Sequence, residues 1–149
     1  MKKYFVLITI VFFSFQLQAQ TSQDTIDIKR VALAYIEAQH TLNPKLMESA
    51  LHPRLVKRSV FRSKAAQKDY ISEYFAENMV ILAETYNAKG DKFPKNPRKD
   101  IKLLDVSART ASVKLLADAW IDYMHIVKTN GEWKIINVLW QYNDVSQHE

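Results

Sequence analysis

The dipeptide Asn130-Gly131 lies between two β-rich runs, Trp120–Lys128 and Glu132–Tyr142. Asn-Gly in this setting is a strong hairpin signal, because both central residues of a type I′ turn need a positive φ. Two further runs with a period of two, residues 101–106 and 111–119, precede them. The C-terminal part of the chain is therefore predicted to be an antiparallel meander.

A helical pattern begins at Ile26, where apolar residues recur at spacings of three and four. The buried face of this helix is predicted to comprise Ile28, Val31, Ala32, Tyr35, Ile36 and Gln39. Thr25 or Asp24 is expected to cap its start, because both side chains can accept hydrogen bonds from the first turn.

Prolines divide the chain that follows. Asn43-Pro44 marks a break, and Pro44 suits the first position of a second helix, Pro44–Leu51. His52-Pro53 ends that helix, because the residue before a proline is pushed out of the helical region. Residues 55–61 mix apolar and polar side chains and are predicted to form a short strand or an extended segment.

Lys68–Tyr86 carries the strongest helical pattern in the chain. Its apolar stripe comprises Ile71, Tyr74, Phe75, Met79 and Leu82. This spacing predicts a third helix whose stripe faces the core. Ala88–Asp100 contains a glycine, two prolines and five bases, and is predicted to be a solvated loop.

Helices followed by a meander indicate an α+β domain, with about three N-terminal helices on one face of a strongly curved antiparallel sheet. The chain has two glycines, Gly90 and Gly131, and no cysteine. So little glycine excludes a Walker phosphate loop and a GxGxxG dinucleotide fingerprint. The absence of cysteine excludes a disulfide framework and a cysteine nucleophile. A curved sheet with so few glycines must bend through bulges at other residues.

Residues 1–19 have the pattern of a secretory signal peptide: Lys2 and Lys3, an apolar run, and Ala19 at the expected cleavage site. We expect a single exported domain, residues 20–149, that is periplasmic or extracellular and has no stable membrane insertion after cleavage. Its formal charge falls from +5 to +3 without the two lysines. Five of the remaining bases lie in one loop, so the basic balance does not indicate a nucleic-acid partner and none is expected.

The hairpin turn also predicts a register for its two strands. If Thr129 pairs with Glu132, one sheet face carries Trp120, Asp122, Met124, Ile126 and Lys128 opposite Gln141, Leu139, Asn137, Ile135 and Trp133. Tyr123 and His125 then point to the other face. Both faces are apolar, so one is expected to pack on the helices and the other to form a homodimer contact or to be covered by a loop.

Three segments carry a resemblance to a known family. They are Tyr35-Ile36-Glu37, Leu51-His52-Pro53 and the stretch that runs from Asp122-Tyr123 through Lys128 to Asn130-Gly131-Glu132-Trp133-Lys134-Ile135. On these residues the chain resembles the nuclear transport factor 2-like superfamily. Within it, the chain is similar to the lumazine-binding group of exported bacterial proteins.

The resemblance implies a cone-shaped fold in which a bent antiparallel sheet wraps helices around a cavity, commonly as a dimer through the sheet. It implies no reaction. The superfamily holds isomerase-like, dehydratase-like and cyclase enzymes as well as non-catalytic binding and scaffold domains.

A carboxylate on an apolar inner face needs partners, which makes Asp122 a candidate for a functional site. The cavity between the helices and this face is predicted to be lined by Tyr35, Phe75, Met79, Trp120, Asp122, Met124, Trp133 and Asn137. We expect a non-catalytic domain that binds a small apolar or aromatic ligand there.

Two other functions stay open. One is a structural or protein-interaction domain whose cavity is filled by its own side chains. The other is an enzyme of the ketosteroid-isomerase or dehydratase type, with Asp122 or His52 as general base. No cofactor is expected, and no metal-ligand spacing is present, so no metal site is expected either.

Overall fold

The computed structural model describes residues 23–149, and the predicted signal peptide, residues 1–19, lies outside the described residues. Residues 23–40 are helical and are called the first helix below. The other elements are α2 (Pro44–Ala50), β1 (Leu51–Ser63), β2 (Lys68–Phe75), α3 (Ala76–Thr85), β3 (Lys99–Val106), β4 (Thr110–Ala117), β5 (Trp120–Thr129), β6 (Glu132–Tyr142) and the 3-10 helix η1 (Val145–His148).

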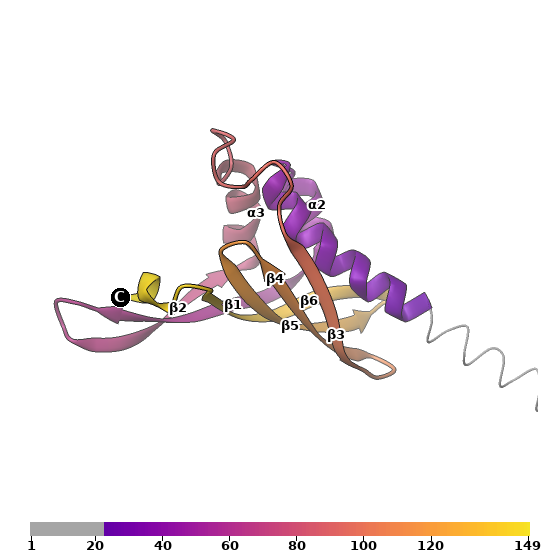
Figure 1. The fold of residues 1–149 in the computed structure, drawn as a ribbon. Coiled ribbons are helices and arrows are strands. Elements are labelled where there is room, and N and C mark those ends of the chain that lie inside the picture. The colour runs from indigo at the N-terminus through magenta and orange to yellow at the C-terminus, as the bar shows by residue number, and fades with distance from the viewer. Residues whose placement is uncertain (1–22) are drawn as a thin grey trace, which may run out of the picture.

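The strands of the described residues form one sheet in the order β2-β1-β6-β5-β4-β3. Neighbouring strands are antiparallel except β1 and β6, which run parallel. The prediction of a purely antiparallel sheet is therefore wrong. β1 follows α2 directly and pairs with β6, which is far away in the chain. Because no hairpin turn connects β1 to β6, the two strands can run parallel. Figure 1 shows the helices on one face of the sheet, with the first helix (indigo) running across the strands.

The predicted face of the first helix is confirmed. Ile28, Ala32, Tyr35, Ile36 and Gln39 are buried, and Val31 packs against the same core while partly buried. The predicted cap is wrong, because Asp24 and Thr25 both lie within the helix. Asp24 instead accepts hydrogen bonds from Lys128 Nζ (2.6 Å) and Trp133 Nε1 (3.0 Å), which ties this end of the helix to the last hairpin.

The second helix is confirmed to within one residue. Its N-cap is Asn43, whose side-chain oxygen accepts a 3.0 Å hydrogen bond from the Leu46 amide. Pro44 follows the cap, where its missing N–H costs no hydrogen bond. The extended segment predicted at residues 55–61 is part of β1, which is longer than predicted.

The prediction of one helix over Lys68–Tyr86 is wrong in its first half. That half is β2, an edge strand that pairs with β1 after a tight turn at residues 64–67. Cross-strand ion pairs join Arg58 to Glu73 (2.6 Å) and Arg62 to Asp69 (3.0 Å). The same apolar residues are compatible with a helix and with a strand. Pairing with the free edge of β1 stabilises the strand.

The last hairpin follows the predicted register only as far as the pair Ile126 and Ile135. Beyond it, His125 pairs with Asn137, so Ile136 is an extra residue and forms a β-bulge. The bulge turns Val138, Trp140 and Tyr142 toward the helices. Asn137, Leu139 and Gln141 accordingly face the other side, against the prediction. Burial agrees, since Val138 is 0% exposed and Leu139 is 54% exposed.

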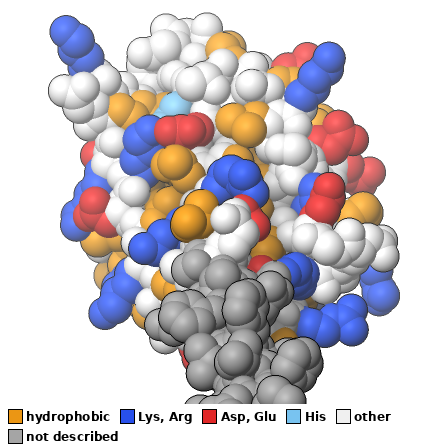
Figure 2. All heavy atoms as spheres, turned by 90° about the vertical axis from the view of Figure 1, so that its right-hand side faces the viewer, with side chains coloured by type: hydrophobic (Ala, Val, Ile, Leu, Met, Phe, Trp, Pro, Cys, Tyr) orange, Lys and Arg blue, Asp and Glu red, His pale blue; other side chains and the backbone are white. Residues whose placement is uncertain are grey.

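The core lies between the helices and the inner face of β4, β5 and β6. Its fully buried sheet residues include Leu55 on β1 and Val113, Leu115, Met124, Ile126, Ile135 and Val138. Seen from the right of Figure 1, the surface mixes basic, acidic and apolar side chains (Figure 2). Within residues 23–149, no helix combines the length and apolar character needed to cross a membrane.

Candidate functional site

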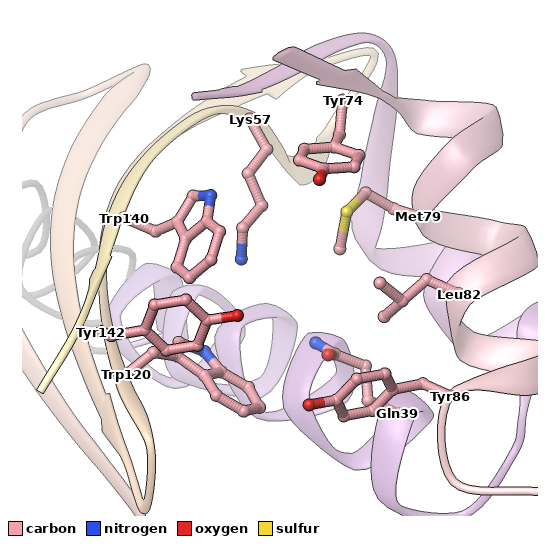
Figure 3. A pocket seen from close by; sticks show the side chains of 9 residues that line it. All are labelled: Gln39, Lys57, Tyr74, Met79, Leu82, Tyr86, Trp120, Trp140 and Tyr142. Carbon is pink, nitrogen blue, oxygen red and sulfur yellow. The ribbon is translucent and has the colours of Figure 1, made fainter. Parts of the chain in front are cut away.

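A cavity of about 210 Å³ opens between the inner face of the sheet and the first helix and α3. It is lined by Gln39, Lys57, Tyr74, Met79, Leu82, Tyr86, Trp120, Trp140 and Tyr142 (Figure 3). Five of these nine side chains are aromatic and one carries a formal charge. The cavity therefore has flat apolar walls with few polar groups, as small-molecule sites commonly do.

The ammonium group of Lys57 reaches this cavity from β1. Its Nζ donates hydrogen bonds to Tyr35 Oη (2.7 Å) and Asp122 Oδ1 (2.8 Å). The Lys57 side chain is 9% exposed and the Asp122 side chain is 0% exposed. A buried charge is costly unless it is paired, so the two groups hold each other in place.

Asp122 has no free oxygen in this arrangement. Trp120 Nε1 donates a 2.8 Å hydrogen bond to Oδ2, while Lys57 occupies Oδ1. The carboxylate thus fixes both the lysine and the indole ring that forms one cavity wall. Its role in the described structure is to position these two side chains.

Tyr35 completes this buried cluster from the first helix. Complete burial, and secondly the negative charge of Asp122, raise the pKa of the Tyr35 phenol well above its usual value. The phenol consequently stays protonated at neutral pH, and its oxygen accepts the hydrogen bond from Lys57.

The wall formed by Trp140 and Tyr142 depends on the bulge in β6 and on the C-terminal helix η1. His148 Nε2 accepts a 2.8 Å hydrogen bond from the Tyr142 amide. The His148 ring lies 5.7 Å from the Trp140 ring and 5.1 Å from the Tyr142 ring, centroid to centroid. Lys57 Nζ lies 4.8 Å from the Trp140 ring centroid on the cavity side. The His148 ring therefore supports both aromatic side chains that form this wall.

The loop between α3 and β3 packs against two other side chains that line the cavity. Phe93 packs edge-on against Tyr86 (5.7 Å between centroids) and Trp120 (6.0 Å). Asn87 Nδ2 donates a 2.9 Å hydrogen bond to the His40 carbonyl and ties the loop to the end of the first helix. The predicted loop is confirmed except for Lys99 and Asp100, which belong to β3, and its Phe93 side chain packs against the cavity wall.

Four of the predicted site residues lie in or beside this cavity. Met79 and Trp120 line it, and Tyr35 and Asp122 hold Lys57. Met124 is buried in the core.

The structure does not bring the remaining predicted residues to this cavity. Trp133 lies at the other end of the sheet against Asp24. Phe75 is 48% exposed and lines a separate groove at α2 and α3. Asn137 lies on the outer face, where Arg58 Nη1 donates to its side chain (3.3 Å), so its predicted inward position is wrong. His52 Nδ1 accepts a hydrogen bond from the Arg54 amide (3.1 Å) and does not line the cavity.

Sequence reasoning did not identify Lys57 as a site residue. A signal was present, because Leu55, Lys57 and Ser59 alternate toward the buried side of β1, and a buried lysine calls for a carboxylate. Trp140 and Tyr142 were also missed, because the bulge that turns them inward has no glycine to mark it. Among residues 23–149, no group of three or more potential metal ligands comes together.

The fold is similar to that of solved nuclear transport factor 2-like proteins. A solved structure of a nuclear transport factor 2-like protein of unknown function from Silicibacter pomeroyi DSS-3 is 12% identical, with a TM-score of 0.64 over 83% of this chain and 98% of that one. One from Shewanella baltica OS155 is 15% identical, with a TM-score of 0.62 over 82% and 95%. A hexachlorocyclohexane dehydrochlorinase is 11% identical, with a TM-score of 0.57 over 85% and 89%.

Residues 23–141 match the family model described as "Putative lumazine-binding", and the chain belongs to that family. No curated protein sequence matches the chain. The structural likenesses show the fold alone, and they confirm the predicted α+β fold.

We predict that Lys57 and Asp122 stabilise the fold as a coupled pair. Asp122→Asn should lower the free energy of unfolding by roughly 3–5 kcal/mol, because the buried ammonium loses its carboxylate. Lys57→Met should cost a similar amount for the converse reason. The double variant should lose less than the sum, with a coupling free energy of about 0.5–3 kcal/mol in urea denaturation.

The exposed pair of Arg62 and Asp69 provides the control for this cycle. Asp69→Asn should change the free energy of unfolding by less than about 1 kcal/mol, because solvent screens the pair. Additive losses for Lys57→Met and Asp122→Asn would contradict the coupling.

Proposed function

We propose that the protein is an exported, non-catalytic domain that binds a small, flat, largely aromatic molecule in the cavity of Figure 3. The observation that carries the proposal is an open cavity with five aromatic walls and one buried ammonium group. Aromatic side chains offer flat ligands both apolar contact and stacking. Export rests on the signal-peptide pattern of residues 1–19.

The size of the cavity limits the ligand. At about 210 Å³ it is smaller than the roughly 300–1,000 Å³ of pockets for drug-sized molecules. A ligand with a single ring or with two fused rings fits a cavity of this size. The name of the family suggests lumazine, a flat two-ring heterocycle, as the first compound to test.

The geometry favours binding over the enzymatic alternative. A general base must come within hydrogen-bond reach of a substrate proton. The Asp122 side chain is fully buried, accepts hydrogen bonds from Lys57 and Trp120, and does not line the cavity. His52 does not line the cavity. An open cavity also favours a ligand site over a domain whose interior is filled by its own side chains.

We predict that Leu82→Trp abolishes ligand binding by filling the cavity. Ile81→Trp is the matched control, because Ile81 is the neighbouring residue of α3 and points to solvent. Isothermal titration calorimetry with lumazine and other two-ring aromatics should detect at least one ligand for the wild type and for Ile81→Trp. It should detect none for a Leu82→Trp variant that still unfolds cooperatively.

Either of two results would count against the site. The first is that no compound of the panel binds the wild-type protein at high micromolar concentration. The second is that Leu82→Trp binds as tightly as the wild type, which would place the ligand elsewhere.

We also propose that the outer face of the sheet forms a homodimer. Tyr123 and Leu139 are exposed there, and Val60 pairs with Ile71 on the same face. Exposed apolar side chains on four neighbouring strands, interspersed with the ion pair of Arg58 and Glu73, suit an interface better than a free surface.

Light scattering tests the dimer directly. The wild type should have the mass of two chains, and Leu139→Arg should have the mass of one, because the new charge would be buried in the interface. Ile81→Arg changes an exposed residue on α3 and should leave the dimer intact. A monomeric wild type would exclude the dimer.

A further inference from the structure

Three tyrosine hydroxyl groups point toward the centre of the cavity. They belong to Tyr74 on β2, Tyr86 at the end of α3 and Tyr142 on β6 (Figure 3). Within the described residues, none of these hydroxyls has a hydrogen-bond partner in the protein. Phenol groups collected from three separate elements and left unpaired are available to a ligand.

The charges of these groups follow from their surroundings. Burial, and then the neighbouring Tyr86 and Tyr74, raise the pKa of Tyr142. Burial also raises the pKa of Tyr86. The phenols of Tyr86 and Tyr142 therefore remain protonated at neutral pH and can donate hydrogen bonds.

Lys57 adds a further donor to the same space. An ammonium group has three donors, and Tyr35 and Asp122 accept two of them. Among residues 23–149 the third has no hydrogen-bond acceptor, and Lys57 lines the cavity, so this donor can serve a group bound there beside the Trp140 ring. None of the nine lining residues is acidic. An aromatic cage alone would suit a cation, but a lysine within the cage repels one.

The loop beside the mouth of the cavity is basic as well. Lys92 Nζ lies 5.9 Å from the centroid of the Tyr86 ring. Lys89 and Lys95 belong to the same exposed loop. A local excess of positive charge attracts anions toward an adjacent site.

We infer that the ligand is a flat aromatic acid whose carboxylate lies among the three tyrosine hydroxyls and Lys57, while its rings contact Trp120 and Trp140. This inference rests on the proposed function, because it assigns the ligand class of the same cavity. The carboxylate would accept hydrogen bonds from neutral phenols and one ammonium, and such charge-assisted bonds are the strong ones.

Three probes of one shape and different charge test the inference. We expect calorimetry at neutral pH to show that 2-naphthoate binds about tenfold tighter than the neutral 2-naphthamide, because hydrogen bonds to a charged acceptor are stronger. The cation 2-naphthylmethylammonium should bind most weakly. If the amide binds as tightly as the acid and Leu82→Trp still abolishes binding, the ligand site stands and the acid is excluded. If none of the probes and none of the panel binds, the proposed function itself fails.

A hydroxyl deletion separates this role from a merely structural one. Tyr142→Phe should weaken 2-naphthoate by about fivefold and change 2-naphthamide less, because the lost donor served a charged acceptor. Tyr70→Phe is the matched control, since Tyr70 lies on β2 outside the cavity and is exposed. An unchanged affinity of Tyr142→Phe for 2-naphthoate would overturn the inference.

Discussion

The buried ion pair between Lys57 and Asp122 is the contact around which the cavity is arranged. It joins β1 to β5, and through Tyr35 it also joins both strands to the first helix. A lysine at the inner face of β1 would be costly without this carboxylate, and the carboxylate would be costly without the lysine and the Trp120 indole. The pair thereby places a fixed cation at the edge of an aromatic space. Removing either partner would leave a charge that this space cannot solvate.

The sequence predicted correctly those parts of the fold that are determined by residues close together in the chain. The turn at Asn130-Gly131 and the buried face of the first helix follow from φ preferences and from helical spacing, and both are present. β2 was mistaken for a helix, because its strand state depends on pairing with β1, which no local pattern reveals. The parallel pairing of β1 with β6 is likewise a property of the assembled sheet.

The candidate site could be predicted only in part, because it also depends on contacts between segments that are far apart in the chain. Asp122 was identified because a carboxylate between buried positions needs a partner, but its partner lies 65 residues earlier in the chain. The bulge at Ile136 then exchanged the two faces of β6, which brought Trp140 and Tyr142 inward and moved Asn137 outward. The scarcity of glycine indicated that bulges must exist, but it could not indicate where.

A high-resolution crystal structure of the ligand-free protein would show whether the buried ion pair and the open cavity exist together. We expect that Lys57 Nζ donates to both Tyr35 and Asp122, and that an open space remains between Tyr74, Tyr86 and Tyr142. Rotation of Tyr86 or Trp140 into that space, or a Lys57 side chain turned out to solvent, would contradict this expectation. The first result would leave no room for a ligand, and the second would remove the cation on which its recognition depends.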